Sequence, residues 1–137
     1  MKKLLMIALI AITAIACNKN QSAVKKLDGE WKATKLIFSN KPTINYATVF
    51  DYRLIFNVCD LKDNEYCSMT TKITFDTDVE TETGFFKVTS DGTVLILSED
   101  AANGDDQTLT IVDLSSDKLK LTLKEGNDTI EFELEKQ

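Results

Sequence analysis

From Gly29 to the C-terminus the chain alternates apolar and polar residues in short runs that are separated by turn-forming residues. The clearest runs are Leu119–Leu123, in which leucines alternate with lysine and threonine, and Ile130–Leu134, in which apolar residues alternate with glutamate. A period of two places the apolar side chains on one face of a β-strand, so each strand has a buried face and a wet face. The sequence therefore predicts an all-β domain.

Eight strands are predicted from these runs and the turns between them. They lie at about residues 29–38, 49–58, 66–75, 81–89 and 93–97, around Leu109 and Ile111, at 118–124 and at 130–135. Asp91-Gly92 predicts a hairpin turn, because both central residues of a type I′ turn need positive φ. Lysines of the seventh strand are expected to face glutamates of the eighth. Eight such strands favour an up-and-down antiparallel barrel, which leaves no open edge, and a β-sandwich is the alternative.

The N-terminus has the composition of an export signal. Two lysines precede an apolar run from Leu4 to Ala16, which is shorter than the ~20 residues of a membrane span. Residues 1–16 are therefore predicted to be a signal peptide. The sequence Thr13–Cys17 resembles the bacterial lipobox, which implies cleavage before Cys17 and fatty acyl chains such as palmitate on that cysteine. The alternative is an ordinary signal peptide in which Cys17 is incidental.

Residues 17–26 contain no acidic residue and are predicted to be a flexible lipidated tether, followed by one folded domain over 27–137. Asn18 replaces the aspartate that holds enterobacterial lipoproteins at the inner membrane. The segment also lacks the acidic cluster of surface-exposed Bacteroidota-type lipoproteins. We therefore expect a cell-envelope protein that is anchored in the outer membrane, with its domain on the periplasmic face.

The charge of the exported chain limits its partners. The full sequence has 16 basic and 22 acidic residues, and removal of residues 1–16 takes away Lys2 and Lys3, which leaves 14 against 22 and a formal charge of −8. Such a surface repels nucleic acid and anionic lipid, so no nucleic-acid partner is expected.

Cys59 and Cys67 remain as a pair once Cys17 carries lipid. Two cysteines in an oxidising compartment predict a disulfide. The alternative, a redox-active pair of thiols, is disfavoured because the spacing is not Cys-x-x-Cys and no neighbouring group would lower a thiol pKa.

The segment Leu27-Asp28-Gly29-Glu30-Trp31, followed by short antiparallel strands, resembles the start of a lipocalin-like domain of the kind found in Bacteroidota lipoproteins. The shared motif is Gly29-x-Trp31, and the resemblance covers roughly residues 27–136. It implies that Trp31 lies on the first strand and plugs the closed end of the barrel. In lipocalins this tryptophan often packs on an arginine near the last strand, whereas the one arginine here, Arg53, is on the second strand.

The residue content argues against an enzyme. The chain has no histidine, which removes the commonest general base and the usual zinc ligand. A serine or threonine nucleophile would need help from lysine or carboxylate, for which no motif is present. We expect no catalytic residue, cofactor or metal ion. The acidic residues Glu99, Asp100, Asp105 and Asp106 could offer oxygens to calcium, but their spacing is not that of an EF-hand and a solvated loop is predicted.

Six residues of the predicted strands would face the barrel interior: Phe50, Tyr52, Leu54, Phe56, Phe86 and Val88. They could line a pocket for one small lipophilic molecule, with Tyr52 as its polar selector, or they could fill the interior as core. The leading hypothesis is a tethered module that captures or carries such a molecule. The alternative is a protein-interaction module, either an accessory subunit of an envelope assembly or an inhibitor of a cell-wall enzyme, that acts through loops Ser39–Thr48 and Ser98–Asp106.

Overall fold

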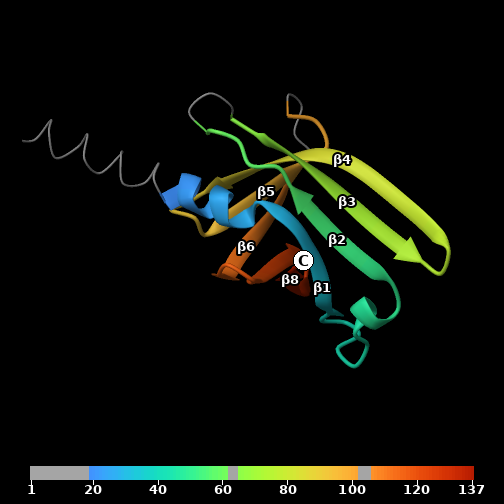
Figure 1. Ribbon diagram of the computed structural model, residues 1–137. Helices are drawn as coiled ribbons and strands as arrows, with labels where there is room; N and C mark the ends of the chain where they lie inside the picture. The colour runs from blue at the N-terminus through green and yellow to red at the C-terminus, as the bar shows by residue number, and fades with distance from the viewer. Residues whose placement is uncertain (1–18, 62–64, 102–105) are drawn as a thin grey trace, which may run out of the picture.

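The protein is an eight-stranded antiparallel barrel that is preceded by a helix (Figure 1). The computed structural model describes residues 19–61, 65–101 and 106–137. Each strand pairs with the next in sequence, and β1 pairs with β8 to close the barrel. The predicted up-and-down barrel is therefore confirmed over the β-sandwich. The predicted signal peptide and Cys17 lie outside the described residues.

The strand boundaries follow the alternation of the sequence. The strands are β1 Gly29–Phe38, β2 Asp51–Phe56, β3 Cys67–Phe75, β4 Asp78–Thr89, β5 Val94–Ser98, β6 Gln107–Leu114, β7 Lys118–Glu125 and β8 Asp128–Lys136. A short 3-10 helix, η1 (Tyr46–Thr48), lies in the segment before β2, which starts two residues later than predicted. β4 starts three residues earlier than predicted, because it pairs with β3 as far as Phe75↔Asp78.

The turn between β4 and β5 lies where the sequence places it but is longer than a two-residue hairpin. Thr89 pairs with Val94, so the turn contains four residues, and Ser90, Asp91 and Gly92 all have positive φ. The N-terminal helix also approaches Gly92 closely. A Cβ at this position would lie 3.3 Å from the Lys19 carbonyl oxygen, which is a tight contact. The glycine therefore serves both the turn and the docking of the helix.

Residues 19–27 form an α-helix that packs on one end of the barrel (Figure 1). The prediction of a flexible tether over 17–26 is therefore wrong for residues 19–26. Val24 and Leu27 are fully buried against the barrel, and the Asn20 side chain accepts a hydrogen bond from the Gly92 N–H at 2.8 Å. Burial of these two side chains stabilises a helix that is too short to be stable alone. Within the described part of the chain, no helix is long and apolar enough to cross a membrane.

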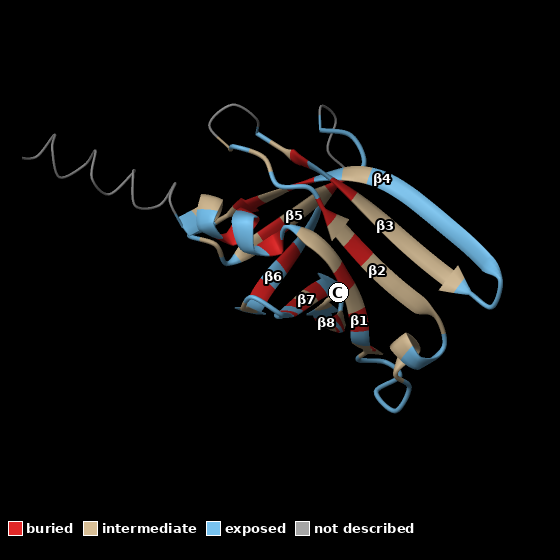
Figure 2. Ribbon diagram, in the orientation of Figure 1, coloured by how far each residue is buried: buried red, intermediate tan, exposed pale blue. Residues whose placement is uncertain are grey.

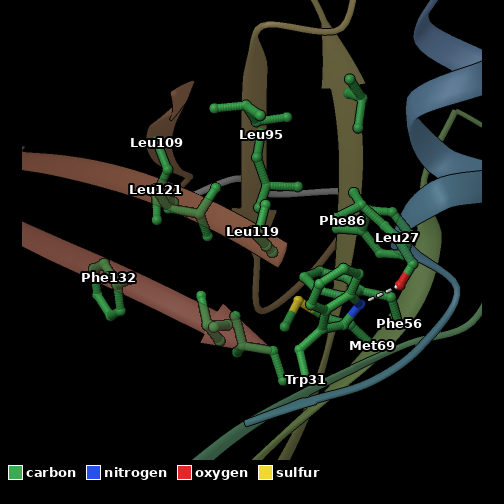
Figure 3. Packing of buried hydrophobic residues seen from close by; sticks show 14 of the residues in the cluster. Leu27, Trp31, Phe56, Met69, Phe86, Leu95, Leu109, Leu119, Leu121 and Phe132 are labelled. Carbon is green, nitrogen blue, oxygen red and sulfur yellow. Dashed lines mark hydrogen bonds between the residues drawn. The ribbon is translucent and has the colours of Figure 1, made fainter. Parts of the chain in front are cut away.

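The helix closes the end of the barrel where the large buried side chains of the hydrophobic core gather (Figures 2 and 3). Trp31 is fully buried there, and its indole Nε1 donates a hydrogen bond to the Leu27 carbonyl oxygen at 2.7 Å. The Lys136 ammonium of β8 lies 5.4 Å from the Trp31 ring centroid. Trp31 therefore lies on the first strand, buried at the end of the barrel that the helix covers, and a lysine of the last strand lies over its ring.

The loop between β2 and β3 is held by a Cys59–Cys67 disulfide, as predicted. The same loop is joined to the N-terminal helix through Gln21. The Gln21 side chain donates to the Cys59 carbonyl oxygen at 3.0 Å and accepts from the Leu61 N–H at 2.9 Å. Disulfide, loop and helix therefore form one unit at the closed end.

Reduction of the disulfide should leave the barrel folded. The bridge joins residues eight apart, and closing so short a loop contributes less than ~3 kcal/mol in the chain-entropy model. We expect a modest fall in melting temperature and an unchanged far-ultraviolet circular dichroism spectrum under mild reduction. A double Cys59→Ser, Cys67→Ser variant should behave like the reduced protein, and loss of the β signal in either would contradict this prediction.

The outer faces of β7 and β8 bear opposite charges that face each other. Lys118 pairs in register with Glu135, and Lys120 pairs with Glu133, with 3.8 Å between the Lys120 ammonium and the Glu133 carboxylate. The predicted facing of lysines and glutamates across the last hairpin is confirmed. Because these side chains are exposed, each pair stabilises the protein weakly.

Candidate functional site

The end of the barrel opposite the helix is shaped by an overhanging hairpin. β4 has twelve residues, but it pairs with β5 only from Phe85 onward, because β5 has just five residues. The first part of β4 and the end of β3 therefore extend past the barrel, which Figure 1 shows as the long ribbon pair whose tip lies far from the helix. This hairpin forms one wall of the barrel mouth.

The segment between β1 and β2 covers another part of the mouth. Asn45 holds it in place, since its side chain accepts from the Leu36 N–H at 2.9 Å and donates to the Thr34 carbonyl oxygen at 3.0 Å. The Tyr46 ring then packs edge-on against Phe38, with 5.1 Å between ring centroids. The uncovered part of the mouth therefore lies on the side of the overhanging hairpin.

A cavity of about 290 Å³ opens at this uncovered side. Its apolar lining consists of Met69, Ile73 and Leu97. Its polar lining consists of Tyr52, Thr71, Thr83, Ser98 and Gln107, with carboxylates from Glu82 and Glu99. Alternation explains the mixture, because Thr71 pairs with Glu82 and Ile73 pairs with Glu80 on the inward face of the hairpin. The mouth is thus a small cavity with an apolar base and a polar, acidic rim.

Tyr52 is the aromatic side chain that lines this cavity. Its ring lies beside Phe132, with 6.0 Å between ring centroids. Burial raises the pKa of the Tyr52 hydroxyl to about 12, and the negative charge of Glu82 adds to the shift, because both disfavour the phenolate. At neutral pH the hydroxyl is therefore protonated and able to donate a hydrogen bond.

Of the six residues predicted to face a ligand, Tyr52 alone lines this mouth cavity. Four of the others, Leu54, Phe56, Phe86 and Val88, are buried in the packed core, and the rings of Phe56 and Phe86 lie edge-on at 4.9 Å between centroids. The sixth, Phe50, is half-buried beside Tyr46. The structure therefore places these four residues in a filled closed half, and the cavity lies above them.

The outer surface beside the mouth bears a charge network that is centred on Asp51 at the start of β2. The Asp51 carboxylate accepts from Arg53 at 2.7 and 2.9 Å, and the Lys32 ammonium lies 3.2 Å away. Arg53 also pairs with Glu30 of β1. The hydrogen bond from Arg53, with help from Lys32, holds the pKa of Asp51 at about 2. This network could not be predicted from the sequence, because it depends on the β1–β2 register, which pairs Lys32 with Arg53.

Stability should depend on the ionised form of Asp51 at acid pH. Because folding lowers this pKa, the contribution is complete above the unfolded value and is lost as pH falls through the folded value. We expect the stability advantage of the wild type over Asp51→Asn to shrink between about pH 5 and pH 2, as measured by urea unfolding at each pH. An advantage that stays constant over this range would show that the carboxylate is not stabilised by folding.

A second, larger depression of about 510 Å³ lies at the closed end, between the helix and the end of β6. Its lining includes Lys19 and Lys26 from the helix and Asp91 and Asp113 from the barrel. It is a surface groove of mixed charge. One of its walls is the helix of residues 19–27, which follows the predicted lipid attachment site, Cys17, in the sequence. The mouth cavity is the stronger candidate, because there apolar and polar groups from strands β2 to β6 converge on one half-open space.

The acidic loop after β5 was predicted to be solvated surface. Glu99 and Asp100 are exposed, and Asp106 accepts a hydrogen bond from the Tyr66 hydroxyl at 3.2 Å, while Asp105 lies outside the described residues. In the described part of the chain, no three acidic or cysteine side chains gather closely enough to hold a metal ion.

No model of a known protein family matches the chain, and no curated protein is significantly similar to it.

Several cavity residues were not identified from the sequence, among them Thr71, Glu82 and Gln107. Glu82 faces inward with the same alternation as buried Phe86 and Val88. This shared position in the alternation is the one sequence signal from which Glu82 could have been predicted to face inward.

Proposed function

We propose that the protein is a lipid-anchored binding module of the cell envelope that captures or carries a small, partly lipophilic molecule at the mouth of its barrel. The observation that carries the proposal is the mouth cavity. Its volume of about 290 Å³ lies at the small end of ligand sites, which are typically ~300–1,000 Å³. Met69, Ile73 and Leu97 offer apolar surface to the ligand, and the Tyr52 hydroxyl offers a donor.

The position of the helix supports this arrangement. Residues 19–27 pack at the closed end, and Cys17 precedes Lys19 by two residues, so a lipid on Cys17 would hold the closed end toward the membrane. The mouth would then face away from the anchoring membrane. We propose that the anchoring membrane is the outer membrane and that the domain lies in the periplasm. No chemical step is proposed for the protein.

Native mass spectrometry with lipid extraction tests the proposal without a guess about the ligand. The mature chain, purified from its own membrane, should carry a stoichiometric small-molecule adduct. Thr71→Trp places an indole in the cavity from a half-buried strand position and should abolish the adduct. Val112→Trp makes the same kind of addition on an exposed outer position, 62% accessible, and should keep it. Absence of an adduct from the wild type, or its retention in Thr71→Trp, would contradict the proposal.

A second candidate is the protein-interaction module, which is favoured by the exposed apolar residues at the hairpin tip. Phe75 and Val79 are 59% and 54% accessible and lie beside Asp76 and Asp78. A basic partner with an apolar pocket would suit such a tip. If this candidate is correct, a double Phe75→Ser, Val79→Ser variant should lose function in the cell while Thr71→Trp keeps it, and the reverse pattern would support the ligand-binding module.

A further inference from the structure

The charged side chains that line the mouth cavity are all negative. This inference rests on the proposed function, and the negative charge indicates which class of ligand the cavity would bind. Glu82 of β4 and Glu99, just after β5, bring carboxylates to the lining, and the lining contains no lysine or arginine. A ligand in the cavity would therefore meet negative charge and no positive side chain. An anionic ligand such as a fatty acid is disfavoured by this arrangement.

The unpaired state of these carboxylates contrasts with the outer surface of the same barrel. On the outside, Asp51 pairs with Arg53 and Lys32, and Glu133 lies within 4 Å of lysines from two neighbouring strands. Glu82 and Glu99 take part in no salt bridge with any described residue. Asp51 and Glu133 on the outer face are thus compensated by basic side chains, whereas the two carboxylates at the cavity have no such partner among the described residues.

The walls beside these carboxylates suit a cation with an apolar body. Tyr52 brings an aromatic ring to the lining, and the quadrupole of such a ring attracts positive charge to its face; the Met69 thioether is soft and polarisable. Contact with Phe132 holds the Tyr52 ring in place. A carboxylate, an aromatic ring and apolar side chains around one small space are the groups that bind alkylammonium head groups in proteins.

We propose that the mouth cavity binds a small organic cation, whose positive group lies between Glu82 and the ring of Tyr52 and whose apolar part rests on Met69, Ile73 and Leu97. Glu99 adds negative charge at the rim and attracts the ligand from solution. The site therefore selects amines and alkylammonium compounds over neutral and anionic molecules of the same shape.

Three probes of one shape test this inference: choline, its uncharged isostere 3,3-dimethylbutan-1-ol, and the anion 3,3-dimethylbutanoate. Each is titrated into the full lipidated chain in a non-ionic detergent, and the methyl resonances of Met69, Ile73 and Leu97 are followed by NMR. Choline should bind about tenfold more tightly than the neutral alcohol, as expected for one cation–π contact and one exposed ion pair. The carboxylate probe should bind most weakly.

Charge-neutralising variants make the result specific. Glu82→Gln should reduce the preference for choline to less than about threefold. Glu135→Gln removes the same charge from the exposed face of β8 and should leave the preference unchanged. Equal binding of choline and the alcohol at these methyl groups would overturn the cation inference while the binding module stands. Absence of a shift at these groups with any probe would overturn both.

Discussion

Replacement of Trp31 by alanine should lower the free energy of unfolding by about 3–5 kcal/mol, the cost of removing a buried large aromatic side chain. Trp31 is the largest of the fully buried residues, and it lies between the barrel interior and the helix (Figure 3). The substitution also removes the Nε1 donor, which leaves the Leu27 carbonyl oxygen without this partner. Because a small domain has only ~5–15 kcal/mol of stability, the variant should be marginally folded.

Urea unfolding followed by circular dichroism measures this effect. Fluorescence serves only for the wild type, since Trp31 is the one tryptophan in the chain. Trp31→Phe separates packing from hydrogen bonding: it keeps an aromatic ring and should cost about 1–3 kcal/mol, mainly for the unsatisfied carbonyl. A loss of less than about 1 kcal/mol in Trp31→Ala would mean that the closed end does not depend on this side chain.

Replacement of Cys17 by serine should release the protein from the membrane or block its maturation. Each buried CH₂ of an acyl chain contributes ~0.8 kcal/mol, and two or three chains give stable attachment. Without the thiol, the chain should be either released in soluble form or retained as a precursor that still has residues 1–16. Fractionation, labelled palmitate and the mass of the N-terminal peptide distinguish these products.

Asn18→Ser is the matched control for this experiment, because it changes the neighbouring residue and keeps the thiol. It should remain in the membrane fraction and incorporate palmitate as the wild type does. Membrane attachment and palmitate incorporation that persist in Cys17→Ser would contradict the proposed anchor.

The barrel could be predicted from the sequence because alternation is a local property. Leu119, Leu121 and Leu123 point inward simply because their neighbours are polar, and all three are buried. The Asp91-Gly92 turn and the Cys59–Cys67 bridge were found in the same way, from local composition. Eight such strands in sequence leave few ways to close a sheet.

The helix and the cavity could not be predicted because both depend on tertiary contacts. Residues 19–27 have three buried apolar residues, Ala23, Val24 and Leu27, which are too few for a recognisable helical period. The cavity exists because β5 ends at Ser98 while β4 extends further, and this difference is set by the strand register. For Phe56 and Phe86 the alternation left a pocket and a filled core both open, with core favoured, and packing under the helix places them in core.

The most direct test of the central claim is a crystal structure of the chain with the molecule that it carries from its own membrane. We expect density in the mouth cavity, in contact with Tyr52 and Glu82, above the unchanged core of Phe56 and Phe86. Density in the groove between the helix and β6, or within a rearranged closed half, would contradict the assignment of the barrel mouth as the binding site.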